Sequence, residues 1–110
     1  MMSVEAALRE AVLPIVPICE PELYEGEAQE YCTFTVNRIP EGFGDGEPRY
    51  LRGLIQLHWF LPRGVSPMKK RRELCRAVLE AGFTYPSVEN ASDKDGQHYV
   101  LEFEGLDGEV

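Results

Sequence analysis

The stretch from Arg49 to Leu61 constrains the fold of this chain more than any other part of the sequence. Polar Arg52, Gln56 and His58 would lie on one face of an extended chain there. Apolar side chains recur on the opposite face: Leu51, Ile55, Leu57, Trp59 and Leu61. This period of two predicts a strand that is buried on one side. A typical strand has about 5–6 residues, so we expect this longer one to run through the middle of a sheet.

Residues 31–38 also alternate between apolar and polar side chains, which predicts a second strand. Residues 40–48 contain three glycines and two prolines, a composition that predicts a mobile loop. The two strands and this loop would form a β-hairpin. The acidic residues 18–30, interrupted by Pro21 and Gly26, predict a surface connection ahead of the hairpin.

Two helices are expected beside these strands. Ser3 can cap a helix over residues 3–13, which ends where prolines follow. A second helix would begin with Ser66 as N-cap and Pro67 in the first position, and would run to Ala81 before a left-handed Gly82. Its expected buried stripe comprises Met68, Leu74, Cys75, Val78, Leu79 and Ala81.

Residues 85–91 and 97–103 predict a second hairpin, with Asp93-Lys94-Asp95-Gly96 as its turn. We expect Tyr99, Leu101 and Phe103 to face inward and the tail over 105–110 to be frayed. A length of 110 residues fits one domain. The sequence therefore predicts a single α+β domain over residues 1–110, in the order α-β-β-α-β-β, with helices packed on a mostly antiparallel sheet.

Cys19, Cys32 and Cys75 are widely spaced and form no Cys-x-x-Cys pair. We expect buried free thiols in a reducing compartment rather than a disulfide framework, a redox dithiol or a zinc site. The N-terminal residues have neither a basic segment nor a long apolar run, so we expect no signal peptide and no membrane span. The protein should then be made and kept in the cytosol.

No catalytic signature is evident in the sequence, and we expect no enzyme. A nucleophile needs a base and an orienting partner, whereas His58 and His98 both fall on predicted strands and are interpreted as sheet-face or surface histidines. Cys75 is expected on a buried helix face, where a reactive thiol is disfavoured.

Metal and cofactor sites are not expected either. Asp93 to Glu104 has the length of a calcium loop, but His98 stands at its sixth position, where such a loop needs glycine. The glycine-rich residues 42–46 lack the Lys-Ser/Thr pair that grips phosphates, and no helix follows them.

Charge is distributed unevenly along the chain, whose net charge is −8. Residues 1–48 hold ten acidic and two basic residues, and residues 89–110 hold seven acidic and one basic. Residues 49–88 between them hold eight basic and two acidic residues. An acidic protein repels phosphate backbones, so nucleic acid is not the expected partner.

Four basic residues occupy the first turn of the second predicted helix, and Arg76 follows one turn later; the four are Lys69, Lys70, Arg71 and Arg72. The helix dipole is positive at that end, so each cation there costs a few tenths of a kcal/mol. Two interpretations stay open, a solvated face and a contact patch for an acidic surface. The chain itself supplies acidic surface at residues 20–30 and 102–109. Complementary patches on one molecule are what head-to-tail ring assembly requires.

Phe43 lies between glycines in the loop of the first hairpin. An exposed aromatic side chain on such a loop is a candidate for contact with a partner. The alternative interpretation, a loose surface loop, stays open as well.

Four stretches of the chain resemble the small tail-terminator, or tail-completion, proteins of long-tailed bacteriophages and of Gram-positive prophages. They are VLPIVPICEPELYEGEAQEYCTF, YLRGLIQLHWFLP, SPMKKRRELCRAVLEAGF and TYPSVENASDKDGQHYVLEFEGLDG. The order of the predicted elements is similar too. The resemblance covers nearly the whole chain but includes no site motif.

The resemblance implies a ring, commonly a hexamer, that caps the finished tail tube and offers a surface to the head connector. Its partners would be other copies of itself, the tail tube protein and the head–tail connector protein, with no membrane and no cofactor. The protein would be made in the cytoplasm of the bacterial host and would end in the tail of the virion.

Other classes of function stay open. A different head–tail connector component would also form a ring. A monomeric acidic binding module, such as an inhibitor or immunity-like protein, need not self-associate. A nucleic-acid accessory protein would act through the cations of residues 69–76.

Overall fold

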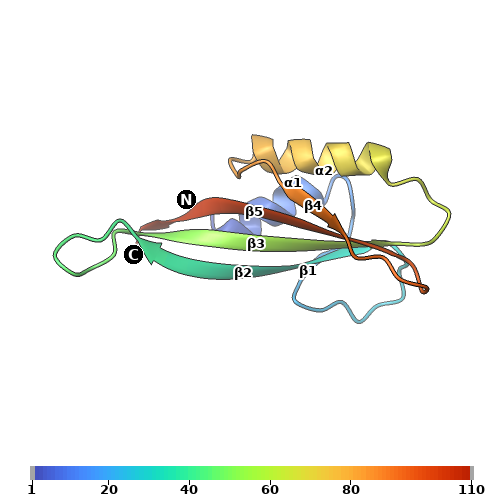
Figure 1. Ribbon diagram of the computed structural model, residues 1–110, viewed down its shortest axis with the longest axis horizontal. Helices are drawn as coiled ribbons and strands as arrows, with labels where there is room; N and C mark the ends of the chain where they lie inside the picture. The colour runs from blue at the N-terminus through green and yellow to red at the C-terminus, as the bar shows by residue number, and fades with distance from the viewer. Residues whose placement is uncertain (1, 110) are drawn as a thin grey trace.

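A computed structural model describes residues 2–109 as a single α+β domain (Figure 1). Its elements in chain order are α1 (Val4–Val12), β1 (Cys19–Pro21), β2 (Tyr31–Glu41), β3 (Tyr50–Leu61), α2 (Met68–Glu80), β4 (Ser87–Asn90) and β5 (Gln97–Glu109). The five strands form one sheet in the order β1-β2-β3-β5-β4. β1 runs parallel to β2, and all other neighbours are antiparallel. The predicted fold class is confirmed, and the long strand β3 lies in the middle of the sheet as expected.

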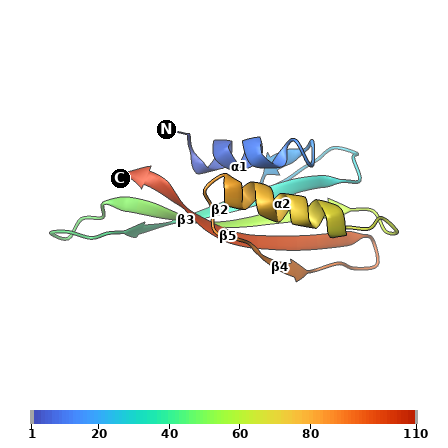
Figure 2. The same cartoon turned by 90° about the horizontal axis from the view of Figure 1, so that it is seen from above.

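The core lies between one face of this sheet and the two helices (Figure 2). The alternating face of β3 supplies Ile55, Leu57, Trp59 and Leu61, which are at most 3% exposed. β5 adds Tyr99, Leu101 and Phe103, as its pattern predicted. Because the helices occupy one face only, the other face of the sheet is left without a helix among the described residues.

The predicted surface connection over residues 18–30 contains a strand that the sequence pattern did not reveal. Cys19, Glu20 and Pro21 pair in parallel with the start of β2, and Cys19 is fully buried. A strand of three residues is too short to show a period of two. Its pairing therefore depends on the edge that β2 offers, and the expectation of a simple surface connection was wrong here.

The prediction of a frayed tail over residues 105–110 was also wrong as far as Glu109. β5 continues to Glu109 and stays paired with β3, with a register irregularity between Tyr50 and Arg52. The Asp107 carboxylate accepts the backbone N–H of Val4 at 3.2 Å and pairs with Arg38. The tail is ordered because β3 is long enough to supply a partner along it. Val110 lies outside the described residues.

The first helix begins and ends close to its predicted limits. Ser3 is its N-cap, and the Ser3 hydroxyl accepts the Ala6 N–H at 3.1 Å. The N-cap of α2 is Pro67 rather than Ser66, and no side chain caps that end. Its C-terminal end is a Schellman motif. Gly82, at φ +102°, donates its backbone N–H to the Leu79 carbonyl, and the backbone N–H of Phe83 donates to the Val78 carbonyl.

The buried stripe of α2 is narrower than predicted. Leu74, Cys75 and Val78 are buried, whereas Met68 and Leu79 are 51% and 38% exposed. Ala81 is exposed as well. A helix that packs on one sheet face buries a limited arc of its surface, so side chains at the edges of that arc remain in solvent.

All three thiols are free and buried, as the sequence predicted. Burial raises the pKa of the Cys19 thiol to about 11 and also raises that of Cys32. Burial raises the pKa of Cys75 too, against the opposing effects of Tyr85 and Arg71. The thiols are therefore protonated at neutral pH and pack as small apolar side chains.

Candidate protein-contact surface

The cations at the start of α2 do not form one surface. Lys69, Arg72 and Arg76 line an open groove of about 530 Å³ beside Ile15, which follows α1. We call this surface the basic groove; it is lined by Ile15, Lys69, Arg72, Glu73, Arg76, Ala77 and Glu80. Lys70 and Arg71 do not line it. The structure thus brings together three of the five predicted cations.

Charge in the basic groove is only partly compensated within the chain. Glu73 and Glu80 also line the groove, at 3.9 Å from Lys69 and 3.8 Å from Arg76. The Lys69 and Arg76 side chains are 85% and 70% exposed, and pairs of this kind contribute little to stability. Arg72 makes no ion pair with any described residue. The groove therefore retains positive charge for another molecule.

Lys70 is paired within the domain, and its side chain is 41% exposed against 85% for Lys69. Its ammonium lies 2.6 Å from one oxygen of Glu30. The other oxygen of Glu30 accepts the indole N–H of the fully buried Trp59 at 3.2 Å. Arg71 is half-buried on another side of the helix, close enough to Cys75 to affect its pKa. Lys70, one of the predicted contact residues, thus holds the carboxylate that accepts the Trp59 N–H.

Replacing Glu30 by alanine should lower the free energy of unfolding by about 1–3 kcal/mol, because a buried N–H loses its only partner. Glu30→Gln keeps an acceptor for Trp59 and should lose less. Urea denaturation followed by tryptophan fluorescence measures both changes. Equal midpoints for Glu30→Ala and the wild type would show that the Trp59 N–H does not depend on this carboxylate.

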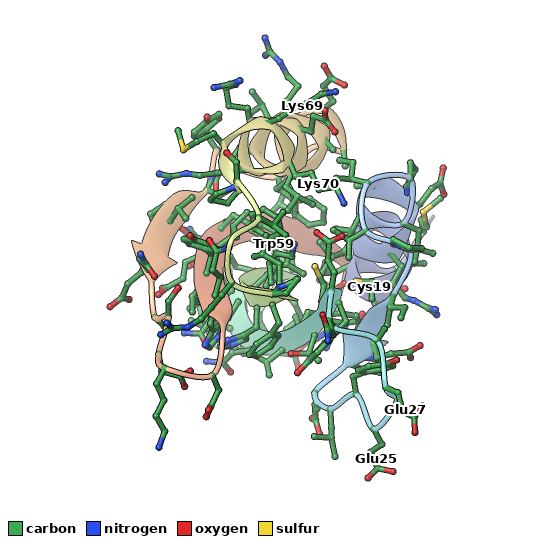
Figure 3. The ribbon with its side chains drawn as sticks, turned by 90° about the vertical axis from the view of Figure 1, so that its right-hand side faces the viewer. Cys19, Glu25, Glu27, Trp59, Lys69 and Lys70 are labelled. Carbon is green, nitrogen blue, oxygen red and sulfur yellow. The ribbon has the colours of Figure 1, made fainter. Side chains whose placement is uncertain are left out.

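Residues 22–30 form an ordered acidic arm. Glu25 and Glu27 lie at one end of the molecule, on the side opposite to Lys69 (Figure 3), while Glu30 at the end of the arm reaches α2 through Lys70. The Tyr24 ring packs against Tyr31 at 4.6 Å, and its hydroxyl accepts the Ala28 N–H at 3.0 Å. A Cβ on Gly26 would lie 2.1 Å from that hydroxyl, so only glycine fits there. The acidic arm exposes the side chains of Glu22, Leu23, Glu25 and Glu27. The signal for this order in the sequence is the Tyr24–Gly26 pair, which neither the breakers nor the charge of this segment indicates.

Figure 3 looks along the long axis of the molecule, onto the end where both surfaces lie. Lys69 lies on the outer side of α2 in this view, whereas Lys70 points inward between α2 and α1. Glu25 and Glu27 project on the side of this end opposite to Lys69. The segregation of charge along the sequence is therefore also a segregation in space.

Phe43 lies far from the basic groove. It is 63% exposed in the loop between β2 and β3, which extends beyond the helices at the other end of the long axis (Figure 1). The domain measures 54 × 25 × 22 Å, so this loop and the start of α2 are separated by most of its length. Phe43 can contact a partner only at a second, separate surface.

His58 and His98 meet on the sheet face that no helix covers. His58 Nδ1 lies 2.9 Å from His98 Nε2, and the His98 ring stacks on Phe60 at 4.2 Å. Burial lowers the pKa of His98, and the nearby His58 lowers it further. His98 is thus neutral at neutral pH. The two rings are within hydrogen-bond distance of each other, which fits the interpretation as sheet-face histidines.

Within residues 2–109, no three His, Cys, Asp or Glu side chains are placed to hold a metal ion together. None of the described helices has the length and apolar character needed to cross a membrane. A scan against protein-family models and a search of curated proteins both find no match to the chain.

Proposed function

We propose that this chain is a structural protein of a phage or prophage that forms a ring on the end of the tail tube and joins it to the head connector. It acts through contacts between proteins. The observation that carries the proposal is the placement of Lys69 of the basic groove, and of Glu25 and Glu27 of the acidic arm, on opposite sides of one end of an elongated domain (Figure 3).

A head-to-tail ring needs two different and complementary surfaces on every copy. The basic groove and the acidic arm have opposite charge. α2, which carries the groove, and residues 22–30 both lie away from the end of the long axis where the β2–β3 loop extends (Figure 1). Such a contact gives a closed ring when the rotation between successive copies closes, and an open filament when it does not. The proposed ring therefore requires a rotation that closes.

The ends of the long axis would then face the axial neighbours, the tail tube protein and the head–tail connector protein. The loop that carries Phe43 reaches beyond the helices at one of these ends and is the candidate for an axial contact (Figure 1). The role assigns no catalytic residue, metal or cofactor. It places the assembled protein in the virion tail and its synthesis in the cytoplasm of the host.

Deleting the gene from its phage or prophage tests this function, with electron microscopy of the induced lysate as the measurement. We expect tail tubes of irregular length beside unattached heads, and recovery when the gene is supplied in trans. Tubes of normal length without heads would indicate a different connector component. Virions of normal appearance would contradict the proposal.

A further inference from the structure

We propose that the acidic arm of one copy docks into the basic groove of the next copy, with Leu23 as the apolar anchor of the contact. This inference rests on the proposed ring and names the two surfaces that meet in it.

Each of the two surfaces has apolar side chains among charged ones. Leu23 is 65% exposed and stands between the glutamates of the acidic arm. The basic groove has Ile15 and Ala77 in its lining, with the three cations, Glu73 and Glu80 beside them. An apolar side chain enclosed by charged neighbours is the usual anatomy of a contact between proteins, in which the centre excludes water and the rim sets the register.

The charges of the two surfaces are also complementary. Glu22, Glu25 and Glu27 are exposed on the acidic arm and make no ion pair among the described residues. Lys69, Arg72 and Arg76 are exposed in the groove, and the pairs of Lys69 and Arg76 with their own helix are long. Carboxylates from a neighbouring copy can therefore approach these cations without breaking a strong internal pair.

The acidic arm is held in a fixed shape before any contact forms. β1 anchors its start, and the Glu22 N–H donates to the Phe34 carbonyl at 2.9 Å. Glu30 at its end is bound by Lys70 and Trp59. A segment that is already ordered loses little conformational entropy on docking, so more of the contact free energy remains as affinity.

Charge reversal on each surface tests the docking. One variant carries Glu22→Lys, Glu25→Lys and Glu27→Lys, and the other carries Lys69→Glu, Arg72→Glu and Arg76→Glu. All six side chains are exposed, so both variants should keep the circular dichroism of the wild type. We expect self-association of each variant to weaken roughly tenfold to a hundredfold, as measured by sedimentation or light scattering.

Mixing the two variants in equal amounts should restore assembly, because each groove then meets an arm of opposite charge. A matched control reverses Glu89, Asp95 and Glu102, three exposed acidic residues of the β4–β5 region, to lysine. It changes the net charge by the same amount as the arm variant and should leave assembly unchanged.

A cysteine pair gives a second readout. The variant with Leu23→Cys and Ile15→Cys should form a ladder of covalent oligomers on mild oxidation, whereas Leu23→Cys alone should stop at dimers. The native thiols are buried and do not interfere.

Assembly that survives both reversals, or no ladder from the cysteine pair, overturns the docking while the ring itself stands. A wild-type protein that stays monomeric also overturns the docking. The role in the tail is decided separately, by the virions of the deletion strain.

Discussion

Replacing Trp59 by alanine is expected to lower the free energy of unfolding by about 3–5 kcal/mol, the cost of removing a large side chain from a packed core. Trp59 is fully buried on β3, the middle strand of the sheet. Its ring packs against Tyr99 at 5.5 Å, and its N–H is held by Glu30. Domains have only about 5–15 kcal/mol of stability, so this variant loses a large share of it. A calorimetric midpoint more than about 10 °C below that of the wild type is the expected result.

Trp59→Phe separates the ring from its hydrogen bond. It keeps an aromatic side chain in the core and removes the N–H, so it should cost roughly 1–2 kcal/mol. A Trp59→Ala variant that melts within a degree or two of the wild type would show that Trp59 does not lie at the centre of this core.

Replacing Gly105 by alanine is expected to cost about 1–3 kcal/mol through overpacking, although it adds only a methyl group. A Cβ at Gly105 would lie 2.5 Å from Cδ1 and 2.8 Å from Cε1 of Phe83. The Phe83 ring cannot yield easily, because it is 6% exposed and packs edge-on against Phe103 at 5.3 Å. Phe83 is also fixed by its backbone N–H, which donates to the Val78 carbonyl in the Schellman motif of α2. Chemical denaturation measures the loss.

The sheet supplies a matched control for this change. Gly53 on β3 is paired directly with Gly105 on β5. A Cβ at Gly53 would come no closer than 3.4 Å to the Gly105 carbonyl oxygen and 3.5 Å to Val36. Gly53→Ala should therefore leave the unfolding midpoint nearly unchanged. Equal effects of the two substitutions would contradict the close contact between Gly105 and Phe83.

Long periodic segments made most of the fold predictable from the sequence. The strand over Arg49–Leu61 shows its buried face at position after position, and the structure begins β3 at Tyr50. β1 has three residues and no such pattern, and each of them pairs with a β2 residue thirteen positions further along the chain, as Cys19 does with Cys32. The end of β5 contains glycines, so its own sequence predicts a frayed tail. Its order follows from pairing with β3, whose length the local pattern of β5 does not show. Elements defined by a partner rather than by their own pattern were the ones missed.

The same distinction applies to the candidate contact surface. The run of cations from Lys69 to Arg72 is visible in the sequence. The sequence does not show which of them line the basic groove and which are paired within the domain. Lys70 is neutralised by Glu30, forty residues earlier in the chain. The separation of the acidic arm from the basic groove likewise depends on how α2 and β1 are placed about the sheet (Figure 3). Composition predicted that opposite charges exist on this protein, and only the fold places them on opposite sides.

Self-association is the property that tests the proposed role most directly, and its measurement is the mass of the purified protein by light scattering behind a sizing column. The mass should be taken at low salt and at about 0.5 M salt, where the screening length falls to roughly 4 Å. We expect one closed oligomer at low salt that loosens toward smaller species at high salt, since its contacts are charged. A monomer at every protein concentration and both salt concentrations would contradict assembly through these surfaces and would favour a monomeric binding module.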